Sequence, residues 1–293
     1  MKIQLALLLI HVLSRLPLPL LYRLAWLPAT VLYVLPWRKH KVIAAHIALA
    51  FPEMSPARRR ALHRRNILEM VRLALESGLV WHGSAERIQR RIRKVHGWDQ
   101  VEQAQQAGQG VLLIGGHLGN WEVDALYVSL RGPFTGLYKP PRDRAVDEAV
   151  TRSRSRFGAR LVAAGSPAMR HMLRELRRGG IVGLLMDQQP RQGEGVFAPF
   201  FDHPALTMTL VHRLARHTDC AVIFGHSVRL PGGRGFDLHF ETVTELVAGT
   251  NLETAAAAMN RVLEQHIRTR PEQYLWLYKR FALQPCGQAG PYA

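Results

Sequence analysis

The sequence is poor in cysteine and in acidic residues, and each shortage argues against a class of protein. Only Cys220 and Cys286 occur among 293 residues, too few for a disulfide framework or a Cys-rich zinc site. Asp and Glu number 22 against 39 Lys and Arg, which leaves a formal net charge of +17. This excess predicts a polyanionic partner, either nucleic acid or an acidic membrane surface.

Several motifs are absent as well. No G-x-S-x-G segment occurs, which argues against an α/β hydrolase with a serine nucleophile. The 14 histidines form no H-E-x-x-H or H-x-H cluster, so no metal site is predicted. No helix-turn-helix, zinc finger or RNP-type motif is evident, so nucleic acid is not the predicted partner. What the sequence does contain is 47% apolar residues, the composition of a chain with a folded core.

The amino-terminal segment, residues 3–36, is almost entirely apolar, with Arg15 and Arg23 as its only strong charges. About 20 such residues are enough to span a bilayer. Three prolines interrupt the segment, and an Arg near mid-span costs roughly 2.5 to 3.5 kcal/mol on insertion scales. The segment therefore predicts a membrane anchor that either spans or lies in the interface. A cleaved signal peptide is a third alternative, although no small-residue cleavage site follows the apolar stretch.

Basic residues are concentrated just after this segment. Residues 38–94 contain 14 Lys or Arg and 4 Asp or Glu, an excess of +10 out of the total +17. By the positive-inside rule, such a flank holds the rest of the chain on the cytoplasmic side of the membrane. Anionic membrane lipids are thus a predicted partner of this region.

Hydrophobic patterning divides the chain into four parts. Residues 1–40 are the predicted anchor, residues 41–107 a basic helical region packed on the domain that follows, residues 108–285 an α/β domain, and residues 286–293 a flexible tail. Within 41–107, Ser55 and Pro56 provide an N-cap and first turn for a helix to about residue 80.

Beyond residue 110, short apolar runs alternate with helical stretches. Strands are predicted at residues 111–114, 135–138, 160–162, 181–185, 221–228 and 236–242. Helices are predicted from about residues 120 and 144, and over 166–178, 207–217 and 252–269. This alternation predicts an αβα sandwich around a largely parallel or mixed central sheet.

The segment with the clearest chemistry is residues 111–122, in which a buried strand runs into a glycine-rich turn and then a helix. Ligand sites in open α/β sheets lie at such strand ends. The glycines leave room for substrate to approach the backbone, and Asn120 is a candidate helix cap. Glu122 follows His117 by five residues, so its carboxylate is predicted to hydrogen-bond one imidazole nitrogen. The other nitrogen is then free to take a proton from a hydroxyl.

Residues 116–122 resemble the H-x4-D/E motif of the bacterial lipid A biosynthesis acyltransferases, within the wider glycerolipid acyltransferase superfamily. Three further pairs of segments are similar to the family's ordered motifs: residues 137–141 with 154–158, 187–188 with 197–201, and 271–276 with 280–281. The resemblance extends over roughly residues 10–282. The sequence departs from the family pattern at Lys139, Asp202 and Tyr278, where Arg, Gly and His are usual.

The resemblance implies transfer of an acyl group from a thioester carrier to the 3-hydroxyl of an acyl chain on a phosphorylated lipid A precursor. His117 is then the general base and Glu122 its orienting partner, without a covalent enzyme intermediate. Arg156, Arg154 and Lys139 are the residues expected to bind the oxyanion or the acceptor phosphates.

Asn120 and Asp187 are further candidates for substrate contact, although Asp187 is equally suited to hold a loop or pair with an arginine. No cofactor is expected. The donor is acyl carrier protein or acyl-coenzyme A, and the location is the cytoplasmic face of a bacterial inner membrane. Acylation of another lysolipid or amino-acid lipid with the same dyad is the alternative.

Overall fold

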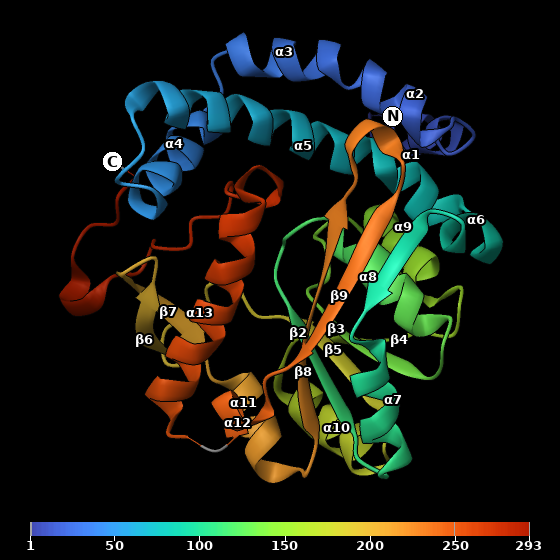
Figure 1. Cartoon of the computed structure of the whole chain (residues 1–293), viewed down its shortest axis with the longest axis vertical. Coiled ribbons are helices and arrows are strands. Elements are labelled where there is room, and N and C mark those ends of the chain that lie inside the picture. The colour runs from blue at the N-terminus through green and yellow to red at the C-terminus, as the bar shows by residue number, and fades with distance from the viewer. Residues whose placement is uncertain (1, 249, 293) are drawn as a thin grey trace.

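A seven-stranded sheet forms the centre of the protein (Figure 1). The structure is a computed structural model that describes residues 2–248 and 250–292. The strands are β1 (Ile92–His96), β2 (Val111–Gly115), β3 (Phe134–Tyr138), β4 (Arg160–Ala163), β5 (Ile181–Leu185), β8 (Ala221–Arg229) and β9 (Phe236–Thr242). Their order is β1-β9-β8-β2-β5-β3-β4, and every neighbouring pair is parallel except β8 and β9. The predicted largely parallel, mixed sheet is confirmed.

Helices cover both faces of the sheet, as the alternation of buried residues requires. Leu112 and Ile114 of β2 join one apolar cluster, whereas Val111 and Leu113 join the other. One face carries α7 (Trp98–Gln106), α8 (Trp121–Ser129) and α9 (Arg144–Ser155). The other carries α10 (Ser166–Arg177), α11 (Leu210–His217), α12 (Thr244–Ala248) and α13 (Leu252–Thr269). The predicted αβα sandwich is therefore confirmed.

Two parts of the fold differ from the expectation. Residues 92–96, predicted as part of a helical region, form edge strand β1, which pairs in parallel with β9. Its exposed Arg93 and Lys94 resemble helix-surface residues, but charges of this kind also protect a sheet edge from further pairing. In addition, β6 (Gly195–Phe200) and β7 (His203–Met208) form an unpredicted hairpin, whose turn places Phe201 and Asp202 at positive φ.

The amino-terminal part folds into α1 (Lys2–Leu13), α2 (Leu18–Leu24), α3 (Trp26–Val34), α4 (Lys39–Ala50), α5 (Pro56–His82) and α6 (Ala85–Gln89). The prediction of a single anchoring helix is not confirmed, because the apolar segment breaks at Pro17 and again at Ala25. None of the helices in the described residues is by itself long and apolar enough to cross a bilayer. Two helical segments, Leu18–Val34 and Lys39–Ala50, together have the length and composition for a span, but the chain bends by 94° at the break between them.

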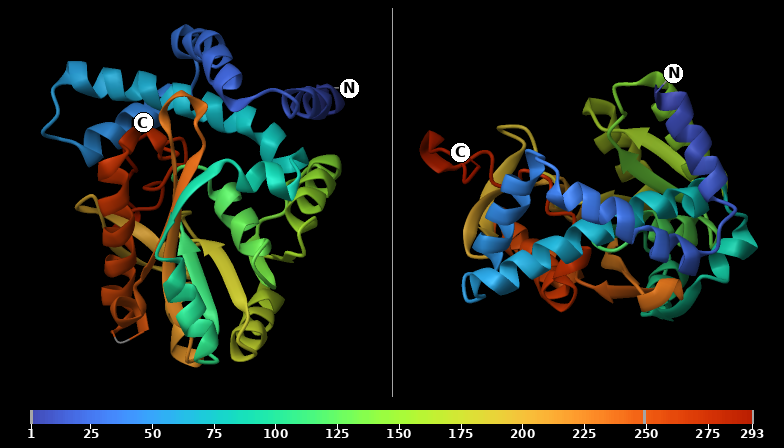
Figure 2. Two further views of the ribbon diagram at one scale, coloured as in Figure 1. Left: turned by 45° about the vertical axis from the view of Figure 1, so that its right-hand side comes forward. Right: turned by 90° about the horizontal axis from the view of Figure 1, so that it is seen from above.

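The helices α1 to α3 present an apolar surface that nothing else in the structure covers. Figures 1 and 2 show α2 and α3 above α5, which itself crosses over the sheet. Leu21 and Tyr22 of α2 are buried, whereas the residues on the outward side of these helices are exposed. These exposed side chains are Leu8, Leu9, Val12, Leu20, Leu24, Trp26, Leu27, Val31 and Val34, with Leu35 after them. We call this group the apolar surface.

The predicted tail makes contacts with the helical region and with the end of the α/β domain. The Tyr292 hydroxyl lies 2.5 Å from Nε2 of His46 in α4 and accepts a hydrogen bond from the Phe281 backbone at 2.9 Å. Residues 285–287 form a short 3-10 turn on the way. The carboxyl-terminal residues are thereby tied to both regions.

Candidate active site

The pairing of β2 with β5 brings His117 and Asp187 together. The two strands run parallel with Gly115 opposite Leu185, so the residues two positions further along each strand also meet. The Nδ1 atom of His117 lies 2.7 Å from Asp187 Oδ1, and the His117 backbone N–H donates to Oδ2 at 2.8 Å. Because a carboxylate can only accept, it fixes the imidazole proton on Nδ1 and leaves a lone pair on Nε2. His117 is therefore arranged as a base.

Asp187 is buried but stays ionised. Burial opposes its negative charge, yet the His117 contacts and the Arg280 guanidinium outweigh this effect and lower its pKa below the ordinary value. Burial and the nearby Asp187 carboxylate raise the pKa of the Tyr274 hydroxyl well above its ordinary value. Arg280 is 3% exposed and donates to the Leu206 backbone oxygen. These groups come from the carboxyl-terminal motif, which thus supports the histidine through Asp187.

Three side chains lie close to the imidazole of His117, on which Nε2 is the nitrogen that does not contact Asp187. The amide nitrogen of Gln188 is 3.4 Å away, within reach of a weak donated hydrogen bond. The rings of Trp121 and Tyr278 are centred 4.6 and 5.0 Å from the imidazole. His117 is 5% exposed, whereas Tyr278 is 41% exposed. Gln188, Trp121 and Tyr278 are therefore the neighbours of the imidazole that a substrate hydroxyl would meet on approach to Nε2.

The prediction that Glu122 hydrogen-bonds His117 is wrong. Glu122 lies in the first turn of α8, where its carboxylate pairs with Arg154 of α9 in a two-pronged contact, with Nε donating to Oε2 at 2.8 Å. Burial would lower the pKa of Arg154, but the contacts with Glu122 raise it overall. The carboxylate that orients the histidine is that of Asp187. Glu122 instead fixes an arginine beside the same turn.

Close packing accounts for two glycines of the turn. Gly119 has a φ of +62°, and a Cβ there would lie 1.8 Å from the Ser227 backbone oxygen. A Cβ on Gly116 would lie 2.7 Å from Leu263 of α13. The expectation that these glycines leave room for substrate is therefore wrong for both positions. They let the turn fit against the protein's own β8 and α13.

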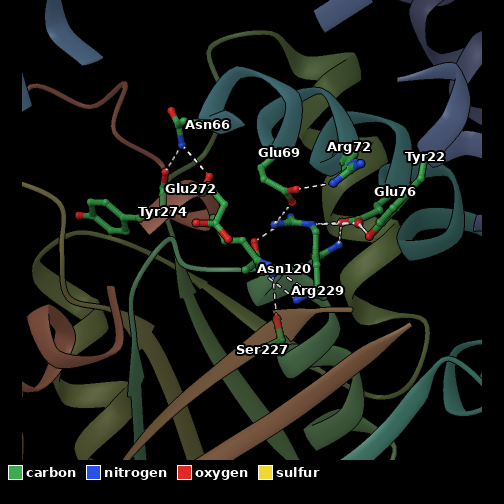
Figure 3. A network of polar contacts seen from close by, with 12 residues as sticks. Tyr22, Asn66, Glu69, Arg72, Glu76, Asn120, Ser227, Arg229, Glu272 and Tyr274 are labelled. Carbon is green, nitrogen blue, oxygen red and sulfur yellow. Dashed lines mark hydrogen bonds and ion pairs between the residues drawn. The ribbon is translucent and has the colours of Figure 1, made fainter. Parts of the chain in front are cut away.

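The turn is also held by a buried ionic network beneath α5 (Figure 3). Arg229 of β8 donates through Nε to both Glu76 oxygens at 2.9 and 2.8 Å, and through Nη2 to the Gly119 carbonyl at 2.8 Å. Glu76 also accepts from the Asn120 amide at 2.8 Å and from the Tyr22 hydroxyl of α2. Glu69 lies 3.9 Å from Arg229. The network connects α2, α5 and β8 to the turn that carries His117.

The prediction that Asn120 caps α8 is wrong. Its side chain makes no cap hydrogen bond to α8, because its amide is directed to Glu76. It is 1% exposed, and its predicted contact with substrate stays a prediction. Its backbone N–H donates to the Ser227 hydroxyl at 2.8 Å. Asn120 is thus a connection between the turn and the ionic network.

We expect Glu76→Gln to destabilise the protein by about 3 to 5 kcal/mol, because it leaves the buried Arg229 charge without its main partner. Denaturant unfolding in detergent micelles measures the change. The matched control is Glu148→Gln, which removes half of the exposed pair between Arg144 and Glu148. That variant should change stability by less than about 1 kcal/mol. Equal effects of the two substitutions would show that the network does not stabilise the fold.

A narrow apolar cavity of about 110 Å³ lies between α8 and the sheet, next to the turn. Four adjacent strands each contribute a glycine to its wall, Gly225, Gly115, Gly183 and Gly136. A Cβ on Gly183 would lie 2.5 Å from the Phe134 ring, and one on Gly115 would lie 2.7 Å from the Gly225 backbone oxygen, so close packing accounts for these two glycines. Leucine, isoleucine and phenylalanine make up half of the remaining wall, and Trp121 lies between the cavity and the imidazole. The cavity has the shape and lining of a site for a hydrocarbon chain.

The polar residues of the cavity include Glu122, Arg154 and Tyr138. The other two predicted basic residues lie elsewhere. Arg156 donates to the Val80 backbone oxygen at 2.5 Å and covers the Phe157 ring, and burial lowers its pKa to about 10. Its contacts therefore join α9 to α5, and its predicted role in binding the oxyanion or the acceptor phosphates stays a prediction. Lys139 is exposed after β3, and its predicted role remains a prediction.

Sequence reasoning did not single out Glu76 or Arg229, and it named Gln188 only as part of the motif at residues 187–188. Gln188 had a detectable signal, since it follows Asp187 at the end of a predicted strand. Glu76 and Arg229 lie in a helix and a strand with no local motif. No group of three or more His, Cys, Asp or Glu in the described part of the chain is arranged to hold a metal ion.

Known proteins resemble this chain over most of its length. The family described as bacterial lipid A biosynthesis acyltransferase matches residues 2–282. The lipid A biosynthesis lauroyltransferase of Escherichia coli (strain K12) is 29% identical over 256 residues, which cover 87% of this chain and 83% of that protein. The palmitoleoyltransferase of the same strain is 28% identical over 87% and 82% of the two chains. The myristoyltransferase is 24% identical over 84% and 76%.

Proposed function

Because the chain belongs to the bacterial lipid A biosynthesis acyltransferase family, we propose that it transfers a fatty acyl group from a carrier thioester to a hydroxyl of a phosphorylated lipid A precursor. The observation that carries the proposal is a histidine with one free nitrogen beside an apolar cavity. The acceptor hydroxyl is that of a 3-hydroxyacyl chain already on the sugar. The proposal makes the reaction a late, secondary acylation.

His117 acts as general base in this proposal. Its Nε2 takes the proton of the acceptor hydroxyl while that oxygen attacks the thioester carbonyl carbon. The new C–O ester bond forms, the C–S bond breaks, and the leaving thiolate receives the proton from Nε2. Asp187 holds the tautomer and stabilises the imidazolium between the two proton transfers. No acyl-enzyme intermediate is formed.

Glu122 and Arg154 act together on the donor. Two contacts from the Glu122 carboxylate fix the guanidinium of Arg154, and both residues line the cavity. A positioned guanidinium provides N–H donors for the negative charge that develops on the thioester oxygen. Glu122 is therefore a positioning residue in this proposal. Lys139, exposed at the end of β3, is the candidate for an acceptor phosphate.

The apolar surface of α1 to α3 fits an interfacial attachment to the cytoplasmic face of the inner membrane. Its exposed leucines, valines and Trp26 would enter the acyl region, and the arginines of residues 38–94 would meet anionic head groups. The His117 turn is joined through Asn120 to Glu76 of α5, which also binds Tyr22 of α2, one of the helices that carry this surface. A lipid acceptor can then remain in the leaflet while its hydroxyl reaches the site. The acidic acyl carrier protein suits the basic chain as donor.

A transfer assay with the purified full-length protein tests the function. Vesicles containing a phosphorylated lipid A precursor are incubated with acyl carrier protein thioesters, and products are weighed by mass spectrometry. The proposal predicts one added acyl chain, bound as an ester on an existing acyl chain. Acylation of a lysophospholipid or amino-acid lipid, with the precursor unchanged, would replace the proposed acceptor. No transfer to any lipid would overturn the proposal.

Filling the cavity should reduce transfer selectively. Ala125 lines the cavity from α8, so a phenyl ring in Ala125→Phe occupies space that the donor chain needs. We expect kcat/KM with long-chain donors to fall by on the order of 10², with a smaller loss for short chains. Ala107→Phe, at an exposed position after α7, is the control and should leave the rate unchanged. Equal losses with short and long donors would exclude the cavity as the acyl site.

A further inference from the structure

An acidic side chain lies in the wall of the apolar cavity. Asp124 belongs to the first turn of α8, two residues after Glu122, and it lines the cavity. It is 6% exposed. Its Oδ1 atom is buried and accepts no hydrogen bond, while Ser227 contacts the carboxyl through its hydroxyl and its backbone N–H. A hydrocarbon chain cannot hydrogen-bond to such a group. A buried polar atom without a hydrogen-bond partner is uncommon in folded proteins and calls for an explanation.

The charge state of Asp124 suits contact with a neutral ligand. Burial raises the pKa of this carboxyl well above its ordinary value, although Ser227 and Arg229 act in the opposite direction. A neutral carboxylic acid has one O–H donor and retains acceptor capacity. Of the groups that occur on fatty acyl chains, a hydroxyl matches both functions. A saturated chain offers neither a donor nor an acceptor at this position.

The position of Asp124 along the cavity indicates which hydroxyl it can reach. Glu122 and Arg154 lie at the proposed site of the thioester carbonyl, and Asp124 shares the first turn of α8 with Glu122. Ser227, which contacts Asp124, also holds the Asn120 backbone N–H in the catalytic turn. Asp124 therefore lies near the reacting end of the cavity and not at its far end.

We propose that Asp124 is a specificity-determining residue that binds a hydroxyl near the carbonyl end of the transferred acyl chain. The inference rests on the proposed acyl transfer and adds the chemical class of the donor. The enzyme prefers hydroxyacyl thioesters to unsubstituted thioesters of equal length. A plain chain leaves Oδ1 of the carboxyl facing methylene groups without a partner, and sites built to bind a substrate hydroxyl discriminate strongly against analogues that lack it.

The test compares 3-hydroxyacyl and unsubstituted acyl carrier protein thioesters of equal chain length, using the full chain in vesicles that contain the lipid A precursor. The ratio of the two kcat/KM values is the readout. For the wild type we expect a preference of at least about tenfold for the hydroxylated donor. Asp124→Leu should abolish or reverse that preference, because no polar atom remains. Asp124→Asn should keep a reduced preference, since an amide still hydrogen-bonds a hydroxyl.

A matched control separates specificity from support of the turn. Ser227→Ala removes the hydroxyl that joins Asp124 to Asn120 but leaves the Asp124 carboxyl in the cavity. This variant should slow both donors by the same factor and preserve the ratio. Equal kcat/KM values for the two donors in the wild type would overturn the inference while leaving the acyl transfer intact. Absence of transfer from either donor would instead show that the proposed function is wrong.

Discussion

The His117→Ala variant is expected to lose acyl transfer by at least about 10²-fold and by as much as 10⁴-fold, the contribution typical of a positioned general base. Asp187 accepts the Nδ1 proton of His117, so the neutral ring has its lone pair on Nε2, and Trp121 joins this ring to the cavity. The measurement is the single-turnover rate of ester formation with a saturating carrier thioester. Residual activity would report what positioning alone contributes.

Two comparisons show that this loss is chemical. His117 is 5% exposed, so removing its ring leaves a hole, and His117→Gln therefore provides a second variant of closer volume. His217→Ala, at the exposed end of α11, controls for the loss of a histidine in general. Both His117 variants should retain the thermal unfolding midpoint of a folded protein. A folded His117→Ala enzyme with an undiminished rate would eliminate the proposed mechanism.

The Asp187→Asn variant is expected to reduce the rate by roughly 10⁴-fold, as in hydrolases where the same change reverses the histidine tautomer. The amide NH2 of asparagine donates to Nδ1, which moves the imidazole proton to Nε2 and removes the lone pair that accepts the substrate proton. The side chain keeps nearly the same shape, so KM for the donor should change little compared with kcat.

The control for Asp187→Asn is Asp219→Asn, at an exposed position before β8, which should leave the rate unchanged. Glu122→Gln gives a further comparison, because Glu122 contacts Arg154 and not the histidine. Glu122→Gln should lower the transfer rate with every donor, because it weakens the stabilisation of the transition state. It should leave the imidazole tautomer unchanged. Nuclear magnetic resonance of the imidazole nitrogens distinguishes the two cases. An unchanged Nδ1–H tautomer in Asp187→Asn would contradict the explanation of its loss.

Most of the sheet was predictable because its strands are short apolar runs between helices. The strand at residues 181–185 and the helix at residues 252–269 were predicted with the bounds the structure gives them. Strand β1 was missed because Arg93 and Lys94 suggest a helix surface, and only its pairing with β9 explains them. The family resemblance carried by the motifs is confirmed by the match over residues 2–282.

The site was predicted in part, and the error has a structural cause. His117 was identified from local sequence, since a strand, a glycine turn and a helix are contiguous. Its partner was assigned to Glu122 because that residue is close in the chain. Asp187 lies 70 residues away and reaches His117 only because β2 and β5 are neighbours in register. The ionic network of Glu76 and Arg229 depends likewise on α5 crossing the sheet, which no local pattern encodes.

The most direct test of the account is a double-mutant cycle between His117 and Asp187. If Asp187 acts only through the imidazole, Asp187→Asn has nothing left to perturb once the ring is gone. The single-turnover rate of the double variant should then equal that of His117→Ala alone. A double variant slowed by the product of the two individual losses would show that Asp187 acts independently of His117 and would contradict the pairing on which the proposed mechanism rests.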